Sequence, residues 1–201
     1  MTGERPTGAT GTGTPEDPLF FDGPEAFEAW LAEHHASSPG VWLKIAKKHT
    51  GIASLSWATL VEVVLCWGWI DGQLRRIDDD FHMQRVTPRR PRSTWSKINR
   101  QKVEALIAAG RMRPPGLAEV ERAKADGRWE AAYDSPATAT VPDDLAAALE
   151  AAGARPAFDA LTKSQRYSIL HPIMTAVKPE TRARRIAKHV DLLARGEGPG
   201  S

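Results

Sequence analysis

The chain has 201 residues, of which 41% are hydrophobic and 26% are charged, with 27 Lys and Arg against 25 Asp and Glu. These values are ordinary for a globular domain and exclude a wholly disordered chain, a collagen-like fibre and a disulfide miniprotein. The net charge of +2 excludes a polycation, and the single cysteine excludes an intramolecular disulfide and a cysteine-rich zinc site.

The two ends of the chain are poor in apolar side chains. Residues 1–18 are mostly Gly, Thr, Pro and Glu, which cannot offset the entropy of ordering, so we expect a disordered leader there and a second disordered stretch over residues 197–201. A secretory signal would show a basic start followed by an apolar stretch, and this pattern is not visible in the sequence. The longest apolar run, Leu60–Trp69, is shorter than the roughly 20 residues that span a bilayer. We therefore expect a cytoplasmic protein with no membrane span.

The first half of the chain alternates helical and strand-like hydrophobic patterns. Phe27, Trp30 and Leu31 fall at i, i+3 and i+4 and so predict one apolar face of a helix. The predicted elements are, in chain order, a helix starting at Pro24, a strand over 41–48, a helix over 57–67 capped by Ser56, and an antiparallel hairpin of strands 69–77 and 81–87.

Helical patterns dominate from residue 93 onward. Thr162 and Gln165 match a capping box, and Pro172 is expected to kink or interrupt its helix. A Pro/Ala/Thr linker over 135–141 separates a core domain, 19–134, from a helical extension, 142–196. The predicted helices cover 95–109, 116–125, 142–152, 162–177 and a last segment from Pro179. The predicted fold class is α+β: a short antiparallel sheet packed with helices, plus a C-terminal helical extension.

Basic residues concentrate between Arg85 and Arg113, where nine Lys or Arg stand against one acid. Trp67, Trp69 and Trp95 lie close to this segment in the chain. Cations beside indole rings suit phosphate or carboxylate groups that have a flat ring nearby. The alternatives are a solvated face whose arginine stems lie on tryptophan rings, and tryptophans that all belong to the core.

Asp71 stands on the first strand of the predicted hairpin. Strand alternation places Trp69, Asp71 and Arg75 on one face, and Arg85 lies across the hairpin. Paired with an arginine, Asp71 would stay ionised and structural, whereas in an apolar cleft its pKa would rise and it could act as an acid or base. Of the six histidines only His82 is near this position, and none has metal-ligand spacing, so no metal or cofactor is expected.

Several short motifs follow one another in a fixed order. They are G-W-I-D-G at 68–72, R-V-T-P-R at 85–89, S-T-W-S-K-I-N at 93–99, G-R-M-R-P at 110–114, G-R-W at 127–129 and P-E-T-R-A-R-R-I at 179–186. This series resembles the YdeI/OmpD-associated family, also called bacteriocin-protection-like, over about residues 20–196, with departures at Val86 and at His171-Pro172. The resemblance implies a small α+β domain with a C-terminal helical extension, no established reaction, and protection from antimicrobial peptides or envelope stress.

We therefore expect a binding protein rather than an enzyme, which takes an anionic or aromatic small molecule in a stress- or antimicrobial-tolerance role. One alternative is an enzyme that uses Asp71 as general base with help from His82 or Arg85. Another is a basic face that binds nucleic acid or an acidic partner, with an affinity that falls steeply as salt is added. The expected ligand-binding residues are Trp67, Trp69, Asp71, Arg85, Arg89, Trp95, Ser96 and Asn99.

Overall fold

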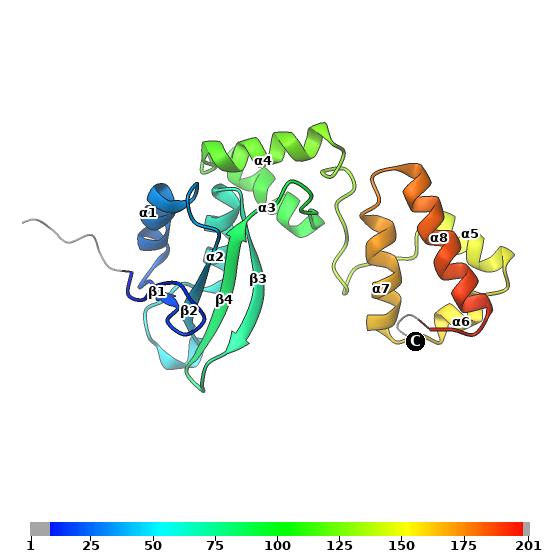
Figure 1. The fold of residues 1–201 in the computed structure, drawn as a ribbon, viewed down its shortest axis with the longest axis horizontal. Coiled ribbons are helices and arrows are strands. Elements are labelled where there is room, and N and C mark those ends of the chain that lie inside the picture. Colours follow the sequence, from blue (N-terminus) through cyan, green and yellow to red (C-terminus); the bar gives the residue numbers. More distant parts are fainter. Residues whose placement is uncertain (1–8, 199–201) are drawn as a thin grey trace, which may run out of the picture. The chain divides into compact units, whose positions relative to one another are not determined.

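The computed structural model describes residues 9–198. They form two compact units, which Figure 1 shows as ribbons. The sheet unit comprises residues 9–93 together with Lys102–Glu121, and the helical unit comprises Thr94–Gln101 and residues 122–198. The predicted linker over 135–141 thus lies within the helical unit.

A four-stranded mixed sheet in the order β1-β2-β4-β3 forms the centre of the sheet unit (Figure 1). The strands are β1 (Leu19–Phe20), β2 (Val41–Ala46), β3 (Trp69–Arg76) and β4 (Phe81–Pro88). β1 runs parallel to β2, and the other neighbours are antiparallel. The predicted α+β class and the β3–β4 hairpin are confirmed. The prediction missed β1 because two residues are too few to show alternation.

Helices and one 3-10 turn lie between these strands and after them in the chain. The helix α2 begins at a capping box in which the Ser56 hydroxyl accepts the Thr59 N–H at 3.1 Å and the Thr59 hydroxyl accepts the Ser56 N–H at 3.1 Å. The elements are α1 (Pro24–His34), η1 (Lys48–Thr50), α2 (Trp57–Cys66), α3 (Lys97–Ala108) and α4 (Pro114–Ala125).

The two faces of the sheet differ in chemistry because side chains alternate along each strand. One face carries the buried side chains of Leu43, Ile45 and Val86; α2 packs against β3 of the sheet, and α1 packs against α2. Each such side chain contributes about 1.5–3 kcal/mol when fully buried. We call the other side the open face; it carries Phe20, Trp42, Lys44, Phe81, Met83 and Arg85, as the strand register shows.

Residues 9–18, which composition places in a disordered leader, form hydrogen bonds to the sheet. Thr10 and Phe20 exchange backbone bonds of 3.2 and 2.8 Å, and the Trp42 N–H donates to the Gly13 carbonyl at 2.9 Å. Gly11 has φ +103°, and a Cβ there would lie 2.5 Å from the Pro18 carbonyl oxygen, so the turn requires glycine. Of the predicted disordered ends, residues 1–8 and 199–201 lie outside the described residues.

The helical unit holds four further helices around its own apolar core, built from residues such as Leu149, Phe158 and Ile173. Pro172, predicted to kink or interrupt its helix, does not interrupt it: it lies in the last turn of α7, which runs on to Met174. No helix in the described part of the chain has the length and apolar character that crossing a bilayer requires. The helices are α5 (Asp143–Ala151), α6 (Arg155–Asp159), α7 (Lys163–Met174) and α8 (Pro179–Ala194).

Candidate functional site

The sheet unit has a cavity of about 580 Å³ at one end of the open face. Phe20 and Phe81 meet edge to face there, with ring centroids 6.4 Å apart. Lys44 also lines the cavity, and its ammonium nitrogen lies 3.9 Å from the centroid of the Phe81 ring. We call this space the open-face cavity; a volume of this size accommodates a small organic ligand.

Its remaining walls come from three loops. Ile52 and Ile77 add apolar surface, although Ile52 is 45% exposed to solvent. The 10–18 loop adds Glu16 and Asp17. The cavity therefore combines an aromatic floor, one cation and, along another wall, two acids.

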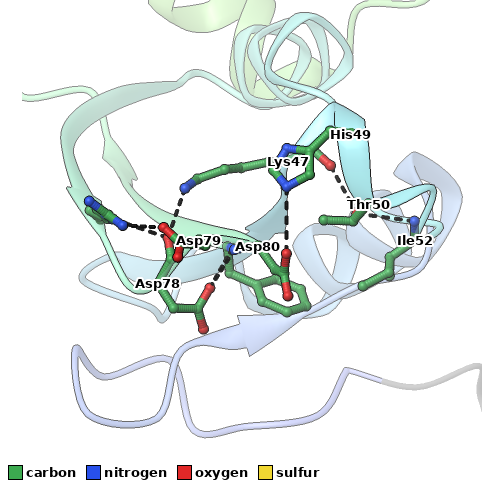
Figure 2. A network of polar contacts seen from close by, with 9 residues as sticks. Lys47, His49, Thr50, Ile52, Asp78, Asp79 and Asp80 are labelled. Carbon is green, nitrogen blue, oxygen red and sulfur yellow. Dashed lines mark hydrogen bonds and ion pairs between the residues drawn. The ribbon is translucent and has the colours of Figure 1, made fainter.

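A network of polar contacts fixes Ile52 beside the hairpin turn (Figure 2). The Lys47 ammonium donates to the Asp78 carbonyl at 2.7 Å, and the Lys47 N–H donates to the Asp80 carbonyl at 2.7 Å. The Thr50 hydroxyl then accepts the Ile52 N–H at 3.2 Å. The Asp78 carboxylate accepts two backbone N–H groups of its own turn, and these bonds lower its pKa.

Ile52 also borders a second cavity of about 600 Å³. Its walls include His82, which points to the helix-covered side beside Ile45, and Trp57, which is 52% exposed at the start of α2. Burial, with a smaller effect of Lys47, lowers the pKa of His82, so the neutral imidazole predominates near neutral pH. Nothing in the described residues groups three His, Cys, Asp or Glu side chains as a metal site would require.

Two of the three tryptophans predicted to line a pocket lie in the interior. Trp69 is 1% exposed in the sheet unit, meets Trp30 edge to face at 6.2 Å, and donates its indole N–H to the His35 carbonyl at 3.3 Å. Trp95 is also 1% exposed and packs on Trp129 in the helical unit, with centroids 5.0 Å apart. Both rings therefore have structural contacts, as large apolar surfaces usually do.

The other predicted ligand-binding residues are divided between the two units. In the sheet unit, Trp67 is half-buried with its ring 4.9 Å from that of His35, and Arg89 is buried. In the helical unit, the Ser96 hydroxyl accepts the Asn99 N–H at 3.1 Å near the start of α3. None of these four lines the two cavities of the sheet unit. Their ligand-binding role stays a prediction.

Asp71 is placed differently from the expectation. A bulge between Asp71 and Leu74 shifts the register, so that Asp71 pairs with Val86 whereas Arg75 pairs with Met83. Asp71 and Arg75 consequently point to opposite faces, and the described residues include no ion pair between Asp71 and Arg75 or Arg85. Of the two alternatives for Asp71, the arginine pair does not form in the described residues, because strict alternation does not hold across a bulge.

Three cations of the basic segment pair with acids that lie far from one another in the chain. Within the sheet unit, Arg111 pairs with Glu62 at 2.7 Å and Arg113 donates to Glu28 at 3.0 Å. Within the helical unit, Lys97 pairs with Asp134 at 2.7 Å. Cations that are close in the sequence therefore form ion pairs with different acids.

Sequence reasoning missed the residues that build the open-face cavity. Lys44 alternates with buried neighbours in β2, and that alternation indicated its outward direction. Phe20 and Phe81 lie about sixty positions apart in the chain, so only the register of β1, β2 and β4 brings them to the same lysine. No local motif carries that information.

Comparison with family models divides the chain in two. Residues 19–119 match a family described as "Domain of unknown function (DUF8412)". Residues 138–196 match the family "Bacteriocin-protection, YdeI or OmpD-Associated". The predicted family resemblance is thus confirmed in the C-terminal helices, which hold the 179–186 motif. The other motifs precede this match, and four of them fall within residues 19–119.

No curated protein and no solved structure matches the chain significantly. The first match spans the four strands of the sheet and half of the whole sequence, whereas the 10–18 loop of the open-face cavity precedes it. The second spans α5, α6, α7 and α8. The chain therefore belongs to the DUF8412 family, and it carries a C-terminal segment of the bacteriocin-protection, YdeI or OmpD-associated type.

Proposed function

We propose that the protein binds a small ligand with an aromatic body and an anionic group in the open-face cavity, as part of a tolerance to antimicrobial compounds. The position of Lys44 is the observation that supports this most directly. Its ammonium lies over Phe81 inside the cavity, and no carboxylate among the described residues pairs with it. A ligand carboxylate could approach this ammonium without displacing a protein acid.

The aromatic floor favours a flat ligand body. Phe20 and Phe81 already meet edge to face, an arrangement that a third ring can extend by stacking or edge contact. Ile52 and Ile77 cover further apolar surface at the side. Binding here would remove solvent-exposed apolar area at about 25 cal/mol per Å² before the costs of association.

Glu16 and Asp17 narrow the ligand class. Because both acids line the same cavity as Lys44, a second negative charge on the ligand would be repelled and a positive group stabilised. Zwitterionic aromatic compounds, with one carboxylate and one amine, therefore suit the site better than dianions. The tolerance role rests on the family to which residues 138–196 match.

The experiment compares Lys44→Met with Lys48→Met by calorimetric titration of aromatic carboxylates with and without an amine. Lys48 is exposed, lines only the second cavity and undergoes the same change of charge, so it serves as the matched control. We expect binding to wild type and Lys48→Met, and a loss of about tenfold or more in Lys44→Met, as for a charged hydrogen bond. Equal affinity in both variants, or no binding of any aromatic carboxylate, would overturn the proposal.

The tolerance role needs its own test in cells. Cells that lack the chain would be complemented with wild type or Lys44→Met and exposed to bacteriocins and other antimicrobial peptides. Restored survival with wild type and poorer survival with the variant, at equal protein level, would support a role through this cavity. Survival independent of the chain would contradict the tolerance role while leaving ligand binding intact.

A further inference from the structure

A second feature of the open face lies beside the cavity and is independent of it. The guanidinium carbons of Arg75 and Arg85 lie 4.6 and 6.0 Å from the centroid of the Trp42 ring. The indole is only 5% exposed. Two cations from neighbouring strands therefore make cation–π contacts with one buried ring on the open face of the sheet.

The bulge in β3 creates this arrangement. With strict alternation Arg75 would point to the same side as Asp71, but two residues between Asp71 and Leu74 stand opposite Arg85 and reverse the phase. Arg75 then pairs with Met83 and joins Arg85 and Trp42 on the open face. Bulges often redirect a side chain beside a functional site.

Neither arginine pairs with an acid in the part of the chain that the structure describes. Arg75 donates only to the neutral Gln73 side chain, at 3.3 Å, and Arg85 has the Trp42 ring as its side-chain contact. The next residue, Arg76, lies on the other face and pairs with Asp79 of the turn. Both guanidinium carbons lie within 6.0 Å of the centroid of one ring, and a ring face is a weaker partner for a cation than an acid is.

We propose that Arg75 and Arg85, which lie against the buried Trp42 ring, form a binding site for a phosphomonoester group. A phosphomonoester carries between one and two negative charges near neutral pH and three acceptor oxygens, which matches two planar guanidinium groups better than one carboxylate does. This site goes beyond the proposed function because it is separate from the open-face cavity. Lys44 and Arg75 lie on either side of Met83 in one row across the sheet, so their backbones are two strand spacings, or about 10 Å, apart.

The test titrates phenyl phosphate and inorganic phosphate into wild type, Arg75→Gln, Arg85→Gln and Arg76→Gln. Arg76→Gln is the matched control because it removes the same charge from the adjacent position on the other face. We expect phenyl phosphate to bind wild type and Arg76→Gln alike, and about tenfold or more weakly to each of the other two variants. Lys44→Met should bind phenyl phosphate normally, which separates this site from the cavity.

Fluorescence gives a readout specific to this ring. Inorganic phosphate should change the emission of wild type, and this change should disappear in Trp42→Phe, which keeps a flat ring in the same place. Absence of phosphate binding, equal losses in all three arginine variants, or binding confined to a single-stranded oligonucleotide would each overturn the proposal. The last outcome would indicate attraction of a polyanion without a phosphomonoester site.

Discussion

The ammonium nitrogen of Lys44 lies 3.9 Å from the centroid of the Phe81 ring, inside the open-face cavity. A cation–π contact at a half-exposed position contributes about 0.5–1 kcal/mol. Lys44→Met keeps an apolar stem over the ring, so we expect the free energy of unfolding to fall by about 1 kcal/mol or less. Phe81→Ala also loses the Phe20 contact and should cost more, about 2 kcal/mol.

Urea unfolding of both variants checks this ordering. The unfolding measurement also serves as a control for the ligand experiment. A Lys44→Met protein that unfolds like wild type but no longer binds aromatic carboxylates has lost a ligand contact and not its fold. A larger loss of stability in Lys44→Met than in Phe81→Ala would show that the lysine holds the loops of the cavity together instead.

Much of the fold could be predicted because its signals are local. Ser56 precedes an apolar run and Thr162 is followed by Gln165, and both begin helices through capping boxes. The hairpin was recognisable from two alternating strands around three aspartates. β1, with two residues, has its place only because β2 pairs with it.

The site could not be predicted in the same way because it depends on register and burial. The bulge after Asp71 has no distinct sequence signal beyond Gly72, yet it decides which face Arg75 joins. Trp69 and Trp95 stand beside polar motifs in the sequence, but the apolar area of an indole outweighs those neighbours and draws both rings inside. Arg85 was expected to contact a ligand, and the phosphomonoester proposal retains that expectation.

The close approach of α4 to the end of α2 makes Gly116 a sensitive position. A Cβ at residue 116 would lie 2.2 Å from the Cys66 carbonyl oxygen, which belongs to backbone and cannot move aside. We expect Gly116→Ala to lower the free energy of unfolding by about 3 kcal/mol, despite the better helix propensity of alanine.

Gly110→Ala is the comparison for this effect. Gly110 has φ +65°, and a Cβ at residue 110 would have no atom within 4 Å, so alanine there meets only the cost of the left-handed backbone, about 1–2 kcal/mol. Chemical denaturation of the two variants measures both costs. If Gly116→Ala were the milder change, α4 would have to shift away from α2 with little penalty.

His82 should make the stability of the sheet unit depend on pH. Burial first, and Lys47 second, lower its pKa below the usual value of about 6.5. The unfolded chain therefore binds the proton first as the pH falls, and stability present above about pH 6.5 is lost as the pH falls through the folded pKa. We expect His82→Gln to lose less stability than wild type between about pH 7.5 and pH 5.5.

Lys47→Met supplies an independent check on the cause. Removing the neighbouring cation should bring the pKa of His82 part of the way back and so reduce the pH dependence without abolishing it. His171 and His189 of the helical unit have lowered pKa values too, so some dependence will remain in both variants. An unchanged slope in His82→Gln would assign the effect to those two residues.

In the helical unit, Arg182 holds the Asp144 carboxylate through two bonds of 2.6 and 2.8 Å. These bonds lower the pKa of Asp144, so their stabilisation is present above its usual value of about 3.9 and is lost as the pH falls through the folded pKa. Both side chains are partly exposed, so a double-mutant cycle with Asp144→Asn and Arg182→Met should give about 0.5–1 kcal/mol at neutral pH.

The cycle is needed because Arg182 also donates to the Ile173 carbonyl at 2.9 Å, a bond that the single variant loses as well. The bond to Ile173 is lost in both the single Arg182 variant and the double variant, so it cancels in the coupling energy. The coupling energy therefore measures the interaction between Arg182 and Asp144 alone. Repeated in acid, below the folded pKa of Asp144, the cycle should give a coupling energy near zero. A coupling energy that persists in acid would mean that the neutral carboxyl group binds Arg182 as well as the carboxylate does. The contact between α5 and α8 would then depend on hydrogen bonding and not on charge.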